Sequence, residues 1–369
     1  MNAENSRATK VLMVGPYPPP EGGWATALRE EREALERRGI ECAVLNLGPN
    51  RRTAAGDSMP VRGAVDLVRR LAGHSLRGYA FRLHVNGDSP KGISIVLLAE
   101  IASVFSGRRP CLSFHAGINQ RLFPDRGRPA LRLLWRIVFG LSGTVVCDCE
   151  EVRALIARYR NARDVFAISP FSPKRVRFSE TALPEEIERF AASRRPLLFT
   201  YVAYRPEYEP DVLLEALERA RRAAPGLGCV VVDDRSFPDE RIAARVREGI
   251  ASRGLSDAVV FTGHLDRDAF LTLLARSDLF VRTPVTDGVC SSVLEALYLG
   301  VPVVAVDNGC RPASVIVYEP GNAASLSAKL SDALGRLEDL RREARSAAPP
   351  LEDGAELLAG LVEERYRRR

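Results

Sequence analysis

The sequence contains few of the residues and patterns that build metal centres or membrane spans. It has four histidines and seven cysteines in 369 residues, and the cysteines have neither zinc-type spacing nor matching histidines. No apolar run approaches the length of a membrane-spanning helix, and the N-terminal segment MNAENSRATK is polar, without a hydrophobic signal region. We therefore expect reduced thiols, no metal centre and a cytoplasmic location. Cys147 and Cys149 are the only close pair, for which we favour packing over metal binding.

Lysine is also scarce, since only four of the 53 basic residues are lysines. Residues 1–180 hold 28 basic against 17 acidic residues, a balance of +11, whereas residues 181–369 hold 25 against 30, a balance of −5. A basic N-terminal half can meet an anionic membrane face or a phosphate-bearing acceptor. A solvated arginine-rich surface is the alternative. The sequence contains no nucleic-acid recognition motif and no stripe of interleaved aromatic and basic residues, so it gives no indication of nucleic-acid binding.

Length and composition indicate a globular protein of two domains. The chain is too long for one ordinary core, and its apolar fraction of 46% and charged fraction of 27% are those of globular proteins. Residues 63–77 predict a basic amphipathic helix, which fits either a half-exposed core helix or a helix at a membrane surface.

The stretch from Ser277 to Val306 is the most informative part of the chain. It predicts a buried strand over 279–282, a loop holding Asp287 and Gly288, a helix opened by Ser291 or Ser292, and a second strand over 302–306. Such a unit makes a parallel crossover, and ligands of open parallel sheets bind beyond the carboxyl ends of the strands. We therefore expect the chemistry in this loop.

The string TDGVCSSVLEALYLGVPVVA resembles the donor-binding signature of family 4 retaining nucleotide-sugar glycosyltransferases, which have the GT-B architecture of two Rossmann-like domains. The resemblance implies that Asp287 faces the donor sugar and that Glu295 holds the ribose hydroxyls. It also implies that the backbone of Gly288, Val289, Cys290, Ser291 and Ser292 meets the diphosphate. A helix N-terminus presents unpaired N–H groups to an anion, which makes this reasonable. The chain departs from the signature in having Asp287 for a glutamate and Cys290 where a second glycine is common.

Two motifs in this half of the chain also allow purely structural interpretations. Ser292 and Glu295 also have the spacing of a capping box, in which the glutamate only satisfies its own helix terminus. Asp266 and Asp268 could be mistaken for a D-x-D metal motif, but they open a helix, and we favour an N-cap with an acidic first turn.

Other segments extend the resemblance over nearly the whole chain. The loop PYPPPEGGWAT, with Gly22 and Gly23, resembles the family's segment beneath the donor phosphates, although any tight strand-to-helix turn uses glycines. His115, directly after a predicted strand, resembles a histidine near the donor sugar, whereas we favour a structural role for His84. The segment AVVFTGHL resembles a segment whose backbone, Gly263 to Leu265, borders the nucleobase.

The loop after the first strand of the second domain breaks the pattern. The family usually presents an arginine and a lysine to the diphosphate there, but this chain has Tyr204, Glu209 and Pro210 at those positions. Because a diphosphate leaving group gains negative charge, the loss matters for catalysis. Arg205 is a neighbour that can serve instead.

The fold expected is α/β, with two Rossmann-like parallel-sheet domains facing a cleft. The acceptor-side domain covers 1–170 and is completed by a C-terminal helix over 351–369. A linker spans 171–195, and the nucleotide-sugar-binding domain covers 196–350.

The resemblance implies a retaining, metal-independent transferase with no cofactor, in which Asp287, His115 and Arg205 act on the reacting groups. The donor is a nucleotide sugar, with UDP- or GDP-sugars favoured. The acceptor is a glycan or lipid-phosphate-linked molecule of bacterial cell-surface polysaccharide or glycoconjugate synthesis, with peripheral contact at the inner membrane face. Two alternatives stay open: an inactive relative that senses sugar nucleotides or scaffolds partners, and a sugar-nucleotide epimerase.

Overall fold

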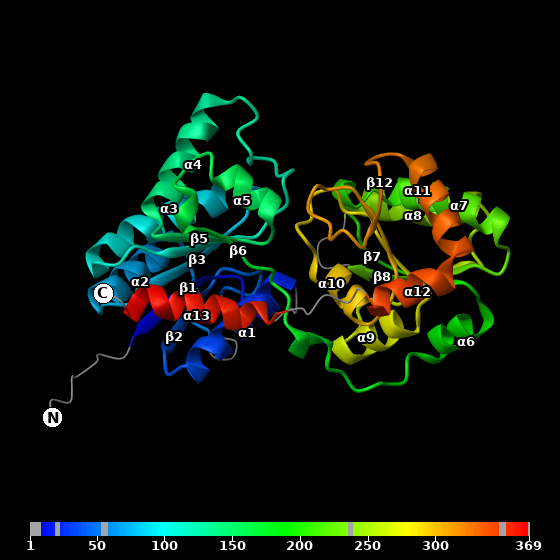
Figure 1. Cartoon of the computed structure of the whole chain (residues 1–369), viewed down its shortest axis with the longest axis horizontal. Coiled ribbons are helices and arrows are strands. Elements are labelled where there is room, and N and C mark those ends of the chain that lie inside the picture. The colour runs from blue at the N-terminus through cyan, green and yellow to red at the C-terminus, as the bar shows by residue number, and fades with distance from the viewer. Residues whose placement is uncertain (1–8, 19–22, 53–57, 235–238, 347–351, 368–369) are drawn as a thin grey trace. The chain divides into compact units, whose positions relative to one another are not determined.

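The chain divides into two compact units, each built on a parallel six-stranded sheet covered by helices (Figure 1). The computed structural model describes residues 9–18, 23–52, 58–234, 239–346 and 352–367. Unit 1 comprises Met1–Ser172 and Glu352–Arg369, and unit 2 comprises Pro173–Leu351. The expected pair of Rossmann-like parallel-sheet domains is confirmed.

Unit 1 has the strand order β2-β1-β3-β4-β5-β6, with every neighbouring pair parallel. Its strands are β1 (Lys10–Gly15), β2 (Glu41–Asn46), β3 (Ala80–Val85), β4 (Cys111–Phe114), β5 (Thr144–Cys147) and β6 (Val165–Ala167). Its helices are α1 (Gly23–Arg37), α2 (Ala64–Leu76), α3 (Pro90–Ser103), α4 (Pro129–Leu141), α5 (Glu150–Ile156) and α13 (Gly354–Arg367), with the short 3-10 turns η1 (Val104–Ser106) and η2 (Ala162–Asp164).

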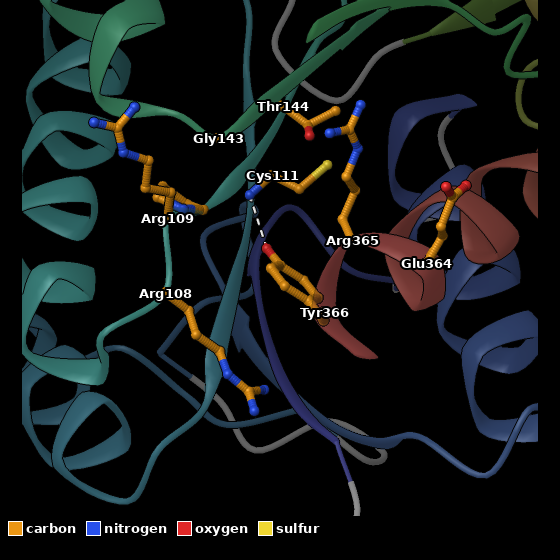
Figure 2. A pocket seen from close by; sticks show the side chains of 9 residues that line it. Arg108, Arg109, Cys111, Gly143, Thr144, Glu364, Arg365 and Tyr366 are labelled. Carbon is orange, nitrogen blue, oxygen red and sulfur yellow. Dashed lines mark hydrogen bonds between the residues drawn. The ribbon is translucent and has the colours of Figure 1, made fainter. Parts of the chain in front are cut away.

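The C-terminal helix belongs to unit 1. In Figure 1, α13 (red) lies beside α1 (blue), against which it packs. Near its end, the Tyr366 hydroxyl donates to the carbonyl oxygen of Phe81 at 2.7 Å and accepts from the backbone N–H of Cys111 at 2.8 Å. The second bond is the dashed line in Figure 2. A residue 255 positions further along the chain thereby satisfies backbone groups of β3 and β4.

Unit 2 has the strand order β12-β11-β10-β7-β8-β9, again all parallel. Its strands are β7 (Leu197–Ala203), β8 (Gly228–Asp234), β9 (Val259–Phe261), β10 (Leu279–Arg282), β11 (Val303–Val306) and β12 (Ile316–Tyr318). Its helices are α6 (Glu185–Ser193), α7 (Pro210–Ala223), α8 (Glu240–Ser252), α9 (Arg267–Arg276), α10 (Ser291–Tyr298), α11 (Ala323–Gly335) and α12 (Leu337–Ser346), with η3 (Pro173–Val176) and η4 (Pro206–Tyr208).

Runs of apolar residues form the strands of both parallel sheets. In β4, β5, β10 and β11 every residue is buried, as expected of strands covered on both faces. Two arginines interrupt the apolar pattern, Arg82 in β3 and Arg282 in β10, and both are buried. A buried arginine requires a partner, and each of these has a carboxylate.

The segment expected to link the domains is part of unit 2. Arg276 on α9 binds both Glu180 and Glu188, with the nearest N–O distances at 2.8 and 2.9 Å. The backbone N–H of Thr181 also donates to the Thr272 hydroxyl at 3.2 Å. These contacts hold residues 173–195 against the second sheet's helices, so the chain passes from one unit to the other near Ser172.

None of the helices in the described ranges is long and apolar enough to cross a membrane. The seven cysteines, all within those ranges, are free thiols. Burial raises the pKa of the Cys42 thiol to about 12, and the Cys147 thiol lies 3.5 Å from the carbonyl oxygens of Cys149 and Phe166. Cys147 is therefore a packed thiol.

Candidate functional site

The loop singled out in the sequence lies at the switch point of the second sheet. Strands β7 and β10 are neighbours, and the chain leaves them in opposite directions across the sheet. Loops at the carboxyl ends of such a strand pair form the usual ligand site of an open parallel sheet. Here the two loops bind each other, because the N–H of Val285 donates to the carbonyl of Glu207 at 3.0 Å.

Asp287 is held by a bidentate ion pair with Arg282. The guanidinium nitrogens Nε and Nη2 of Arg282 lie 2.8 and 3.2 Å from the two carboxylate oxygens. The same guanidinium lies within cation–π range of the rings of Tyr201 and Tyr208, at 5.5 and 5.4 Å from their centroids. Burial alone would favour the neutral acid, but the charge and hydrogen bonds of Arg282 outweigh it and lower the pKa of Asp287. The side chain is therefore a fixed carboxylate.

The residues after β11 fix the backbone of this loop. The amide of Asn308 donates to the carbonyl oxygens of Asp287 and Gly288, at 2.8 and 3.0 Å. Arg311 reaches the carbonyl of Pro284 at 3.3 Å and lies 3.7 Å from the Asp287 carboxylate. The carbonyl groups of Pro284, Asp287 and Gly288 are thus bound by side chains that follow β11.

Helix α10 begins at Ser291, where the sequence predicts it. Its N-cap is Cys290, which adopts φ 69°; its side chain caps no backbone N–H of the helix but lies 3.2 Å from the Ser292 hydroxyl. The first backbone bonds run from the N–H groups of Val293 and Leu294 to the carbonyl of Cys290. The amides of Ser291 and Ser292 therefore precede the intrahelical ladder and point away from the helix.

Glu295 does not form the capping box that its spacing allows. With Ser291 as the first helical residue, Glu295 lies in the fifth position, two residues beyond the third position that a capping box uses. Its buried carboxylate instead pairs with Arg267 at 2.9 and 3.1 Å. Arg267 also donates to the carbonyl of Arg175, whose own guanidinium donates to the Ser291 hydroxyl at 3.1 Å.

Arginine side chains gather around the α10 N-terminus. Four of them contact the loop or the helix, namely Arg175, Arg267, Arg282 and Arg311, and Asp287 and Glu295 pair with the last three. These guanidinium groups, together with the first amides of the helix, suit an anion.

The loop 204–210 has lost the cations that the resembling family places there, and the structure shows what replaces them. The hydroxyl of Tyr204 donates to Asp233 at 2.9 Å in the core. Glu209 is the left-handed residue that precedes α7, and Pro210 opens that helix. Arg205 is exposed directly after β7, which leaves its guanidinium at the edge where the two loops meet.

Gly263 and Leu265 follow β9 on the same sheet. Gly263 adopts φ 67°, a value that favours glycine, and its N–H donates to Asp233 at 2.9 Å. Leu265 is half-buried directly before Asp266, whose side chain accepts from the N–H of Ala269 and caps α9. The N-cap interpretation of Asp266 is confirmed. Among the described residues, no three or more His, Cys, Asp or Glu side chains gather into a metal-binding group.

His115 lies at the carboxyl edge of the first sheet, within a row of polar side chains. Its Nε2 is 3.0 Å from Nδ1 of His84, and its Nδ1 is 3.2 Å from Asp148. The two imidazole planes are inclined by only 3°, and the Trp24 ring packs 5.5 Å from His115. Both ring nitrogens of His115 therefore have protein partners, so its ring face is the part available to a ligand.

His84 is the buried neighbour that sets the orientation of His115. Burial, with the charge of Arg82 and the nearby His115, holds the pKa of His84 well below its ordinary value, so the ring is neutral. Arg82 forms a buried ion pair with Glu31 of α1, and Glu31 lies 3.8 Å from Nε2 of His84. Of the predicted glycines in this unit, Gly23 opens α1, and Gly22 lies outside the described residues.

The sequence analysis missed the arginines of unit 2. Arg282 could have been found, since a charged residue inside an apolar strand signals a buried partner. Arg175 and Arg267 could not be identified in this way, because each lies in a polar stretch of sequence and contacts α10 only in the folded protein. The cavity drawn in Figure 2 is a separate feature: it lies at the amino ends of β4 and β5 in unit 1, away from all these side chains.

Comparison with known proteins agrees with this geometry. Residues 184–348 match the family described as Glycosyl transferases group 1. Unit 2 therefore contains a glycosyl transferases group 1 domain. The matched range holds Arg205, Gly263, Asp287 and Glu295, whereas Arg175 lies before it.

Two curated relatives are similar to this chain. One is the 2-deoxystreptamine N-acetyl-D-glucosaminyltransferase of Streptomyces fradiae, 30% identical over 292 residues, which are 73% of this chain and 66% of that protein. The other is the lipopolysaccharide core biosynthesis mannosyltransferase LpsB of Rhizobium meliloti (strain 1021), 27% identical over 217 residues, 54% and 60% of the two chains. The alignments thus span somewhat less than two thirds of each relative.

The fold as a whole is similar to a crystal structure of Anabaena HepE in complex with UDP. The two superpose with a TM-score of 0.71 at 16% identity, over 96% of this chain and 99% of the other. At this identity the likeness shows the fold, which is the GT-B type of two Rossmann-like domains.

Proposed function

We propose that this protein is a glycosyltransferase that moves a sugar from a nucleotide-diphosphate donor to a hydroxyl-bearing acceptor, with retention of anomeric configuration. The observation that carries the proposal is the arrangement around α10: Asp287 and Glu295 flank a helix N-terminus whose first amides precede the intrahelical bonds, and arginines contact both the loop and the helix. A nucleoside diphosphate offers the matching groups, because it joins two phosphates to a ribose with two hydroxyls.

In this proposal each part of unit 2 meets one part of the donor. The backbone from Gly288 to Ser292 binds the diphosphate. Glu295 exchanges its bond with Arg267 for hydrogen bonds from the ribose hydroxyls, and Asp287 accepts a hydrogen bond from a hydroxyl of the sugar. The segment from Gly263 to Leu265 borders the base. The departing phosphate accepts the acceptor's proton, so the chemistry calls for no metal and no second carboxylate as a base.

The arginines nearest the α10 N-terminus support a catalytic role despite the changed loop 204–210. Negative charge grows on the diphosphate as the glycosidic bond breaks, and fixed positive charge nearby lowers that barrier. Arg175 already lies against Ser291, and Arg205 adds an exposed guanidinium. These residues would replace the missing arginine and lysine.

The donor, acceptor and location are proposed as classes. A UDP-sugar is favoured for the donor, because the structural neighbour HepE was crystallised with UDP, and a GDP-sugar is the second choice. The acceptor is a glycan or lipid-linked molecule of cell-surface polysaccharide or glycoconjugate synthesis, as the name of the Rhizobium relative suggests. His115 and Gly23 are the unit 1 residues that we assign to this reaction. We place the reaction at the inner face of an anionic membrane.

A panel of UDP-, GDP-, ADP- and TDP-sugars tests the proposal. We expect the nucleotide sugars of one nucleobase to raise the melting temperature of the protein. When acceptor extracts are added, the same donor should be consumed and its nucleoside diphosphate released. Mass spectrometry of donor and product measures this. Stabilisation without consumption under all conditions would favour the inactive sensor or scaffold, and conversion of the donor sugar to an epimer without an acceptor would favour an epimerase.

A further inference from the structure

The exposed large apolar side chains of this protein gather on one group of helices in unit 1. Within the described residues, twelve such side chains are exposed, and nine of them belong to α2, α3, η1 and α4. These nine are Val65, Val68, Leu76, Leu98, Ile101, Val104, Phe105, Leu133 and Ile137, which we call the apolar face. Monomeric globular proteins seldom expose so large a gathering without a binding role.

The helical spacing shows that the apolar face is distinct from the core. On α2, Leu67 and Leu71 are buried against the sheet, whereas Val65, Val68 and Leu76 stand 85%, 49% and 79% exposed. These three recur at intervals of three and eight residues, which places them on one side of the helix. Helix α3 is likewise apolar on its inner and its outer side, a property of helices that are covered all round.

The helices that carry these side chains are neighbours. Helix α2 packs against α3 and η1, and α3 packs against α4. Figure 1 shows α3 and α4 side by side, with α2 next to them. Val104 and Phe105, 67% and 72% exposed, lie in the short turn η1 at the junction of α2 and α3. The outer stripes of the helices are thus parts of one apolar surface.

The charge around the apolar face is strongly positive. Residues 61–140 contain thirteen basic and four acidic residues, an excess of nine positive charges. Three of the four acids are already engaged: Asp66 pairs with Arg70, Asp125 pairs with Arg132, and Glu100 is buried. Exposed arginines flank each part of the face, among them Arg69, Arg77, Arg109 and Arg136.

We propose that the apolar face docks this protein on an anionic lipid bilayer, with the apolar side chains in the acyl boundary and the flanking arginines at the headgroups. Helices with an apolar outer side and basic flanks lie at membrane surfaces in this manner. Arginine suits the rim, because its aliphatic stem lies along apolar surface while its guanidinium reaches phosphate.

A second copy of this chain fits the face less well. A two-fold dimer would bring the same basic rim of each copy together, and like charges would then face each other. If the face binds an acidic protein instead of a bilayer, the chain should fail to bind anionic vesicles in the experiment below. The inference gives a surface to the membrane contact included in the proposed function, but it rests on exposure and charge and is tested by binding alone.

Vesicle flotation with the full chain tests the proposal, with no nucleotide sugar present. We expect binding to phosphatidylglycerol/phosphatidylcholine vesicles and at least tenfold weaker binding to phosphatidylcholine alone. The variant Val104→Ser/Phe105→Ser should bind the anionic vesicles about tenfold more weakly, with an unchanged melting temperature because both side chains are exposed. Leu357→Ser, on the 44% exposed position of α13, is the matched control and should bind like the parent.

Three results would overturn the inference. The first is no binding to anionic vesicles. The second is equal binding by the Val104→Ser/Phe105→Ser variant, which would leave charge alone as the cause. The third is a dimer in light scattering that this variant abolishes, which would assign the face to a second copy. A nucleotide-induced thermal shift measured without lipid is independent of all three, so the proposed function can fail or succeed separately.

Discussion

The carboxyl edges of the two sheets differ in how they hold charge. In unit 2 the carboxylates Asp287 and Glu295 are each bound by an arginine. In unit 1 the corresponding edge has neutral His84 beside His115, which also contacts Asp148, and the buried ion pair of Arg82 with Glu31 lies deeper in the sheet. One fold thus builds one edge from arginine–carboxylate pairs and the other around two histidines.

The largest effect is expected from Asp287→Asn, which removes the fixed charge of the unit 2 edge but keeps its shape. If Asp287 acts on the donor sugar, turnover should fall by about 10² to 10³, the usual effect of losing one preorganised group. Steady-state assays with the donor found in the panel measure this. The control is Asp307→Asn, an exposed carboxylate of the neighbouring loop, which should change turnover less than twofold.

A double variant of Asp287 and Arg282 tests whether the loss of turnover in Asp287→Asn has a structural or a chemical cause. Asp287 also neutralises the buried Arg282, so a purely structural role is open to test. In the double variant Asp287→Asn/Arg282→Gln the unpaired charge is gone, and the melting temperature should recover while turnover stays low. Recovery of turnover together with stability would show that Asp287 only supports the loop.

In unit 1, Arg82→Met should destabilise the protein by about 3–5 kcal/mol, because it leaves Glu31 buried without its cation. Urea unfolding followed by circular dichroism measures the loss. Arg245→Met in unit 2 is the control, since Arg245 and Asp211 form a surface pair with side chains 60% and 55% exposed, and such pairs contribute about 0–1 kcal/mol. Equal losses in the two variants would contradict the burial argument.

Glu100 gives unit 1 the opposite pH response to Asp287. It is buried with a hydrogen bond from Ser142 and no cation bound to it, and burial raises its pKa from 4.5 to about 8. The folded state thus retains a proton that the unfolded chain loses near pH 4.5, so the free energy of unfolding falls as pH rises from about 4.5 to about 8. For Asp287, whose pKa is lowered, stability instead falls as the solution becomes more acidic than the usual range of a carboxyl group.

Glu100→Gln should remove the first of these responses. We expect it to stabilise the protein by a few kcal/mol at pH 8 and by little at pH 5, an order of magnitude set by the pKa shift. Melting temperatures across this range measure the difference. Glu151→Gln, at an exposed position of α5, should leave the pH profile as it is. A parallel profile for Glu100→Gln and the parent would contradict the assignment.

The smallest effect is expected from Tyr366→Phe, which tests how α13 is fixed to unit 1. The hydroxyl bridges Phe81 and Cys111, and its loss leaves both backbone groups unpaired. A cost of about 1–2 kcal/mol follows, measurable by urea unfolding. Because the bonds lie in unit 1, nucleotide binding should be unchanged, and a change would mean that α13 also influences the donor edge.

Elements were predictable from sequence where local patterns decide them. The apolar run over 279–282 and the helix start at Ser291 appear where expected, since burial on both faces and a short helix leave a clear signature. The C-terminal helix and the two-sheet architecture also followed from pattern and resemblance. At Glu295 the local pattern allows a second interpretation that the structure rules out: a capping box with Ser292 requires a helix that starts at position 293, but α10 begins two residues earlier.

Side-chain partnerships at the site were beyond the sequence because they join distant segments. Arg175 lies 116 residues from Ser291, and His84 lies 31 residues from His115. Nothing in the chain near Arg267 shows that it will bind Glu295, 28 residues away. Likewise, the helical pattern of α2 could not decide between a core helix and a surface helix, because it has apolar residues on both sides.

Nucleotide binding by two variants of one ion pair tests the central claim most directly. If Glu295 binds the ribose, Glu295→Gln should weaken the Kd of the preferred nucleoside diphosphate at least tenfold in calorimetry, at about 1.4 kcal/mol per tenfold. Arg267→Ala only frees that carboxylate, so it should change the Kd less than threefold. Equal losses in both variants would make the pair purely structural, and no binding of any nucleotide in the panel to the parent protein would contradict the account.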